Sequence, residues 1–101
     1  MYRIEITETA ELEIQEAYNW YYERSPLGAK RWVRSLRRKI ETLRRQPERC
    51  PLARESDAFE DPVRQILYGK RSGVYRVMFH IVGDTVQVIH VRHSALDEVR
   101  P

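Results

Sequence analysis

The dipeptide Gly83-Asp84 restricts the fold of this chain more than any other feature, because it has the composition of a two-residue β-hairpin turn. Runs rich in β-branched and aromatic residues flank the dipeptide at 74–82 and 85–92. Such runs are typical of strands. The C-terminal part of the chain is therefore predicted to contain an antiparallel ribbon.

Counting outward from a tight turn predicts the register of this ribbon. The expected pairs are Val82–Thr85, Phe79–Val88, Arg76–Val91 and Val74–His93. One face, mostly apolar, then carries Tyr75, Val77, Phe79, Ile81, Val86, Val88, His90 and Arg92. The other face is mixed and carries Val74, Arg76, Met78, His80, Gln87, Ile89, Val91 and His93. We expect helices to pack on the first face and the second face to stay open to a partner.

The rest of the chain predicts a short N-terminal strand at 2–6 and two amphipathic helices. Thr7 or Thr9 is expected to cap the first helix, and Ser25 the second, which starts at Pro26 and stops before Pro47. Residues 48–62 are expected to form an irregular loop, 63–68 a strand and 69–73 a loose turn. The predicted fold is α+β: a two-helix antiparallel hairpin packed on a mainly antiparallel sheet, in one domain spanning 1–101.

Composition restricts the cellular compartment and the ligands expected for this chain. With 101 residues, two independent cores are not expected, and no apolar run approaches the ~20 residues that cross a bilayer. The N-terminus lacks the apolar segment of a signal peptide. Cys50 is the only cysteine, which fits a reducing compartment. We therefore expect a cytoplasmic protein without a membrane contact, a cofactor or a metal, since the histidines show no metal-ligand spacing.

Arginine outnumbers lysine by 15 to 3, and the formal net charge is +3. A genome rich in G and C would produce this excess through codon usage alone. Alternatively, the chain has a partner with phosphates or an acidic protein surface, because guanidinium groups bind both in a bidentate way. Composition leaves these two readings open.

Several segments of the chain resemble the RelE/ParE superfamily of toxins. The run 68–81, YGKRSGVYRVMFHI, is similar to the basic turn and central strand of that family, and 83–93, GDTVQVIHVRH, is similar to its last strand. Upstream, EAYNW at 16–20 and GAKRW at 28–32 resemble the helical hairpin of the ParE-like branch. Gln46-Pro47 followed by Cys50-Pro51-Leu52-Ala53 also fits the family. The resemblance covers nearly the whole chain.

The resemblance implies a growth-inhibiting toxin of a type II toxin–antitoxin system, which a cognate antitoxin neutralises. RelE-like toxins cleave messenger RNA on the ribosome, whereas ParE-like toxins inhibit DNA gyrase. A third reading is a degenerate member that only binds its antitoxin. Contact with operator DNA is expected only through the antitoxin. A shared fold does not decide among these activities.

Arg76, His93 and Arg92 are the candidate catalytic residues of a metal-free ribonuclease. Such an enzyme needs a cation for the phosphate charge and a group that carries protons. The resemblance assigns the first role to Arg76, and the predicted register places His93 on the same face. Arg92 would hold the C-terminal segment or bind phosphate. The alternatives are a salt bridge from Arg76 to a loop carboxylate (Asp57, Glu60 or Asp61) and a backbone-bonded His93 at the strand end.

Lys70, Arg71 and Arg54 are the candidate RNA-binding residues, the first two at the tip of the basic turn. The alternative for the turn is that its cations only keep it in solvent. The chain departs from the nuclease branch in two places. Residues 94–101 contain no tyrosine or histidine, and the loop before the sheet contains Arg54 but no lysine. Because arginine is too basic to carry protons readily, the nuclease set is incomplete.

Overall fold

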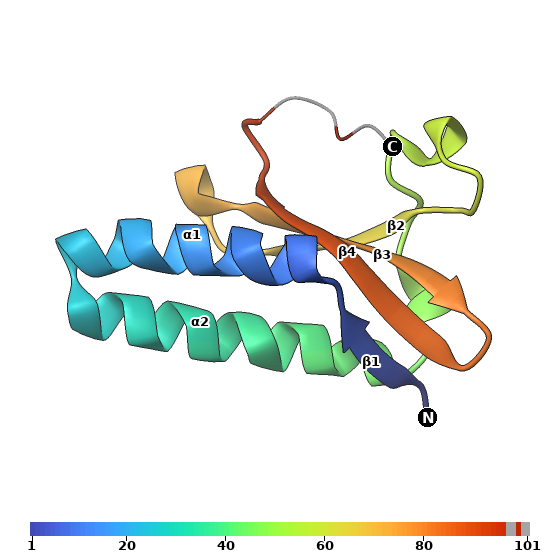
Figure 1. Cartoon of the computed structure of the whole chain (residues 1–101), viewed down its shortest axis with the longest axis horizontal. Helices are drawn as coiled ribbons and strands as arrows, with labels where there is room; N and C mark the ends of the chain where they lie inside the picture. Colours follow the sequence, from blue (N-terminus) through green and yellow to red (C-terminus); the bar gives the residue numbers. More distant parts are fainter. Residues whose placement is uncertain (97–98, 100–101) are drawn as a thin grey trace.

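The structure, a computed structural model, describes residues 1–96 and 99. Two helices, α1 (Glu8–Arg24) and α2 (Pro26–Glu41), lie side by side against a four-stranded sheet (Figure 1). The strands are β1 (Arg3–Ile6), β2 (Arg64–Tyr68), β3 (Tyr75–Val82) and β4 (Thr85–His93). Within the described residues no helix is long and apolar enough to cross a membrane. The α+β fold predicted from the sequence is confirmed.

Two hydroxyl caps define the helical hairpin. The Thr7 hydroxyl accepts a hydrogen bond from the Ala10 amide at 3.2 Å and so begins α1. The Ser25 hydroxyl accepts one from the Gly28 amide at 3.0 Å, and Pro26 occupies the first turn of α2. Each cap satisfies an amide that would otherwise lack a partner. Ser25 alone connects the helices, which forces them to run antiparallel, and α2 ends at Glu41 in a 3-10 turn, Thr42–Arg44.

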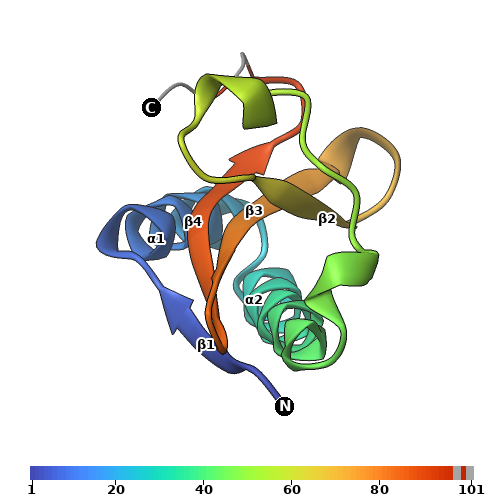
Figure 2. The same cartoon turned by 90° about the vertical axis from the view of Figure 1, so that its right-hand side faces the viewer.

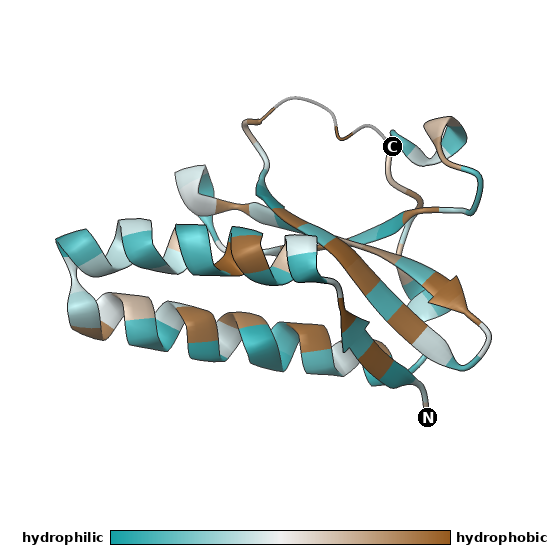
Figure 3. Ribbon diagram, viewed as in Figure 1, coloured by the Kyte–Doolittle hydropathy of each residue, from teal (hydrophilic) through white to brown (hydrophobic). Residues whose placement is uncertain are grey.

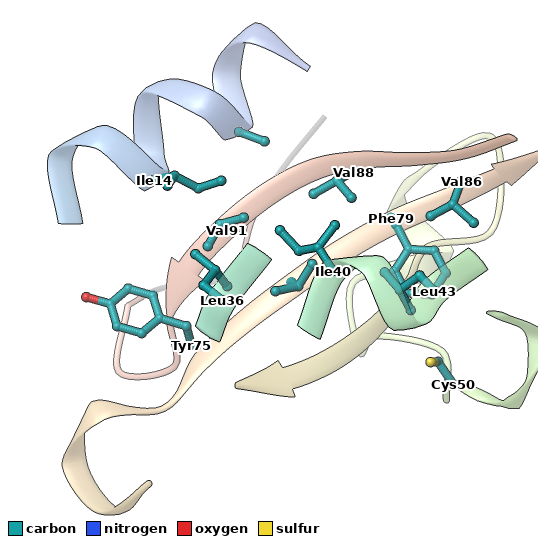
Figure 4. Close-up of a cluster of buried hydrophobic side chains, with 12 residues drawn as sticks. Ile14, Leu36, Ile40, Leu43, Cys50, Tyr75, Phe79, Val86, Val88 and Val91 are labelled. Carbon is teal, nitrogen blue, oxygen red and sulfur yellow. The ribbon is translucent and has the colours of Figure 1, made fainter. Parts of the chain in front are cut away.

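The sheet has the order β1-β4-β3-β2, which is visible in Figure 2. β1 runs parallel to β4, and the other two pairings are antiparallel. The helices and one sheet face enclose the main core, in which Ile14, Leu36, Ile40, Phe79 and Val88 are almost completely buried (Figure 4). Every second residue of β3 and residues at helical spacing in α2 supply apolar side chains to this layer. Apolar and polar residues alternate along β4 and α2 in Figure 3.

A β-bulge between Met78 and Phe79 changes the predicted register of the ribbon. The pairs next to the turn, Val82–Thr85 and Phe79–Val88, are as predicted. Beyond them Met78 pairs with His90, so Ile89 is an extra residue in β4. An extra residue shifts every later side chain of the strand to the opposite face.

The prediction that Val91 and His93 lie on the mixed face is therefore wrong. Arg76 pairs with Arg92 and Tyr75 pairs with His93. Val91 belongs to the main core beneath the helices, next to Ile14 and Leu36 in Figure 4. The bulge thus exchanges the faces predicted for the last residues of β4.

The mixed face is covered at Arg76 and Met78, which contradicts the prediction that it stays open, while His80, Gln87 and Ile89 remain half-exposed. Residues of the loop between α2 and β2 lie over it and form a second, smaller core of Ala53, Val63, Met78 and Val99, with Phe59 and Ile89 packed against it. The Ala53 amide donates to the Val63 carbonyl at 2.8 Å, and the Val63 amide donates to the Ser56 hydroxyl at 2.9 Å. These bonds attach the irregular loop to the sheet.

Candidate functional site

Arg76 lies beneath this loop in a bidentate ion pair with Glu55. Its Nη1 donates to Glu55 Oε2 at 2.7 Å, its Nη2 to Oε1 at 2.5 Å, and its Nε to Gln65 Oε1 at 2.9 Å. The side chains of Arg76 and Glu55 are 7% and 1% exposed. The alternative of a salt bridge to a loop carboxylate is therefore what the structure contains, with Glu55 in place of Asp57, Glu60 or Asp61.

The Glu55 carboxylate satisfies more than one donor. Hydrogen bonds from Arg76 lower its pKa to about 2, against the opposing effect of burial. Glu55 Oε2 also accepts a hydrogen bond from the Val99 amide at 3.1 Å. The pair thus joins β3, the covering loop and a residue near the C-terminus, which is the arrangement of a structural ion pair.

His93 is bonded to backbone groups through both ring nitrogens. Its Nε2 lies 2.6 Å from the Ser72 carbonyl oxygen, and its Nδ1 lies 3.0 Å from the Ala95 amide nitrogen. A carbonyl accepts and an amide donates, so the neutral tautomer with hydrogen on Nε2 satisfies both bonds. The ring also packs edge-on against Tyr75, with centroids 5.2 Å apart. This is the strand-end histidine considered as the alternative to a proton carrier.

The structure does not bring Arg76 and His93 together. Tyr75 faces the helices and is the cross-strand partner of His93, whereas the adjacent Arg76 points to the other side of β3. The prediction that they share one open face is wrong, because the bulge changes the parity of β4. Arg92 is the cross-strand partner of Arg76, but its side chain reaches α1, where its Nε lies 4.0 Å from Glu13 Oε2.

The candidate RNA-binding residues are divided between two regions. Lys70 and Arg71 are exposed in the turn before β3, where Arg71 adopts a φ of 56°. Arg54 is exposed in the loop before β2. The five residues of β2 separate the turn from the loop by about 17 Å of extended chain. These cations do not form one cluster.

A cleft of about 610 Å³ lies between α1 and the end of β4. Trp20 and Leu96 stand at its edge, 52% and 49% exposed, and Tyr75 and His93 line it. The Arg24 guanidinium carbon lies 3.6 Å from the centre of a Trp20 ring, and its Nη1 donates to the Trp20 carbonyl at 2.7 Å. This stacking holds the indole in place while leaving it accessible.

Neither Tyr75 nor His93 of the cleft is placed to transfer a proton. Burial raises the pKa of Tyr75 to about 12, so its phenol remains protonated near neutral pH. Both nitrogens of His93 are engaged with the backbone. Within residues 1–96 and 99 no group of three His, Cys, Asp or Glu side chains is arranged to hold a metal ion. The cleft combines aromatic and apolar walls with the charged residues Glu13, Glu16 and Arg92, and such a cleft is suited to binding a protein side chain.

Sequence reasoning missed Glu55 and Trp20. Glu55 lies 21 residues from Arg76 in a segment without periodicity, so no spacing rule indicates it among the loop carboxylates. Trp20 enters the sequence analysis only as part of a family-like helix, although it falls outside the apolar stripe of Ala10, Ile14, Ala17 and Tyr21. A large aromatic residue off the buried stripe is the signal that could have identified it.

Comparison with known proteins identifies the family and the fold. The family model described as ParE toxin of type II toxin–antitoxin system, parDE, matches residues 4–97. A solved structure of a chromosomal ParDE TA system from P. aeruginosa contains a chain with the same fold. Its TM-score is 0.74 at 17% sequence identity, over 92% of this chain and 96% of that one. A search of curated proteins found no match.

Proposed function

This chain belongs to the ParE toxin family of type II toxin–antitoxin systems, and from that premise we propose that it inhibits DNA gyrase by protein contact and does not cut messenger RNA. The observation that carries the proposal is the burial of Arg76 against Glu55. A phosphate-binding cation has to reach its substrate, and this one is sealed beneath the chain's own loop. The ribonuclease hypothesis also lacks a proton carrier, since His93 lies on the side of the sheet opposite Arg76 and is bonded to the backbone.

Induction of the chain without an antitoxin tests this function directly. We expect a DNA-damage response and arrested replication while messages remain intact by primer extension. With purified components, the protein should inhibit ATP-dependent supercoiling of relaxed plasmid by gyrase. Cuts within codons, with supercoiling unaffected, would instead establish the ribonuclease. Growth without arrest, by a chain that still binds its antitoxin, would establish the degenerate member.

The cleft beside α1 is the proposed site of the cognate antitoxin. The mixed sheet face, the other candidate, is covered at its centre by the loop between α2 and β2. The cleft offers an exposed, pre-positioned Trp20 next to the exposed Leu96, and tryptophan is enriched among residues that dominate binding energies.

Replacing Trp20 with alanine is expected to weaken antitoxin binding by about 2 kcal/mol or more, roughly 30-fold in Kd. The matched control is Tyr22→Ala, an aromatic of similar exposure (45%) on the same helix that does not line the cleft. Isothermal titration calorimetry measures both. Equal affinities for the Trp20 and Tyr22 variants would place the antitoxin elsewhere.

A further inference from the structure

The charge of this protein is concentrated in one stretch of the chain. Residues 26–49 contain nine Lys or Arg and two Glu, a formal charge of 9 − 2 = +7. The other 77 residues contain nine Lys or Arg and thirteen Asp or Glu, a charge of 9 − 13 = −4, which together give the net +3. The modest net charge therefore hides a strongly basic region formed by α2 and the turns that follow it.

Seven cations of this region have no carboxylate partner among the residues that the structure describes. Arg49 donates to the Arg45 and Gln46 carbonyls, and Lys39 is half-buried. The other five are exposed: Lys30, Arg31, Arg34, Arg38 and Arg45. We call these five the basic face. Their neighbours are engaged otherwise, since Arg37 binds Glu11 at 2.9 Å and Arg44 binds Glu41. Four of the five are helical, and at 100° per residue they occupy a sector of about 100° on α2. The buried Leu36 and Ile40 lie on the opposite side.

The basic face is continuous and accessible. Shallow grooves along α2 are lined by Lys30 and Arg34, then by Arg34 and Arg38, and then by Arg38 and Arg45. All five residues are exposed. The single carboxylate within these last two grooves, Glu41, is paired with Arg44. A line of unpaired guanidinium groups is complementary to a regular array of anions.

Only one large apolar side chain, Leu27 in the first turn of α2, is exposed beside the basic face among the described residues. Exposed large hydrophobic residues occur at Leu27 and Leu52 but nowhere between them. Protein interfaces depend on buried aromatic or aliphatic anchors. The exposed aromatic side chains of this kind, Trp20 and Tyr22, are on α1 and not on α2. Nucleic acid backbones need no such anchor, because their binding is mainly electrostatic.

We propose that the basic face binds the phosphate backbone of duplex DNA without reading its sequence. Duplex DNA carries about one charge per 1.7 Å of its axis, a density that five aligned cations can engage. The neighbouring α1 carries five Glu and one Arg, a charge of −4, which orients the duplex toward α2 and away from the cleft. The proposal does not require gyrase to be the target, although on a gyrase–DNA complex this face would hold the toxin against the DNA.

Fluorescence anisotropy tests the proposal. The purified full chain is titrated into a labelled 24-base-pair duplex, and the binding constant is measured at KCl concentrations between 50 and 200 mM. If all five cations contact phosphates, the slope of log K against log salt is about −4.5, which is the steepest slope expected. The variant Arg34→Gln/Arg38→Gln should reduce that slope by about 2 and weaken binding on the order of 50-fold at 0.1 M salt. Circular dichroism confirms that each variant is folded.

The matched control is Lys70→Gln/Arg71→Asn, which removes the same two charges from the turn before β3. We expect its affinity to stay near that of the unsubstituted chain. If both double variants lose the same DNA affinity, binding depends only on net charge and the proposal is wrong. If the unsubstituted chain does not bind DNA at 50 mM KCl, there is no such site. Polyglutamate that displaces the duplex better than unlabelled duplex does would assign the face to an acidic protein and overturn the proposal. Gyrase inhibition is measured separately, so either proposal can fail alone.

Discussion

Replacing Arg76 with alanine is expected to lower the free energy of unfolding by about 3–5 kcal/mol. The substitution leaves Glu55, whose side chain is 1% exposed, as a buried charge without its main partner. A domain of this size has about 5–15 kcal/mol of stability, so much of the protein would unfold in the cell and toxicity would fall. Urea denaturation of the purified variant measures the loss.

A double variant separates this structural role from a catalytic one. In Arg76→Met/Glu55→Gln neither buried side chain is charged, and the introduced amide keeps an oxygen that can accept from the Val99 amide. Replacing a buried ion pair by neutral groups of similar volume is often close to neutral for stability. We expect the double variant to recover most of the lost stability and all of the toxicity. If the double variant folds but is not toxic, Arg76 has a direct role in toxicity.

Acidification is expected to remove about 3 kcal/mol of stability that the Glu55–Arg76 pair provides. The pKa of Glu55 is about 2 in the folded protein against 4.5 for an unperturbed carboxyl. Because the folded pKa is the lower one, the contribution is complete above pH 4.5 and is lost as the pH falls toward 2. Urea unfolding at pH 6 and pH 3 should differ by about 2 kcal/mol from this group alone.

The variant Glu55→Gln identifies the group responsible. It should be less stable than the unsubstituted chain at pH 6, and the two should converge as the pH falls. Glu48 and Asp84, whose pKa values are also lowered, are present in both proteins and cancel in the comparison. Glu60→Gln, at an exposed loop carboxylate, serves as the control and should run parallel to the parent. Parallel curves for Glu55→Gln would mean that the pair does not stabilise the fold.

The sequence by itself determined the elements and the family of this protein. Ser25-Pro26 as a helix start and Gly83-Asp84 as a hairpin turn depend on interactions within a few residues, which the local sequence predicts. The sequence left the first cap open between Thr7 and Thr9, and the structure has Thr7. Periodicity likewise identified the apolar stripe of α2 and the helix-facing side of β3. The order of these motifs sufficed to identify the toxin superfamily.

The contents of the candidate site could not be predicted from the sequence. One extra residue, Ile89, moved His93 away from the face of Arg76, and Glu55 became the partner of Arg76 from 21 residues away. A bulge changes side-chain parity without a strong local signal, since its stability comes from packing on both sides of the sheet. A loop without periodicity gives no indication of which carboxylate will be buried. The residues of the surface site depend on the bulge and on the buried loop carboxylate. Tertiary packing determines both features, and the sequence pattern does not indicate them.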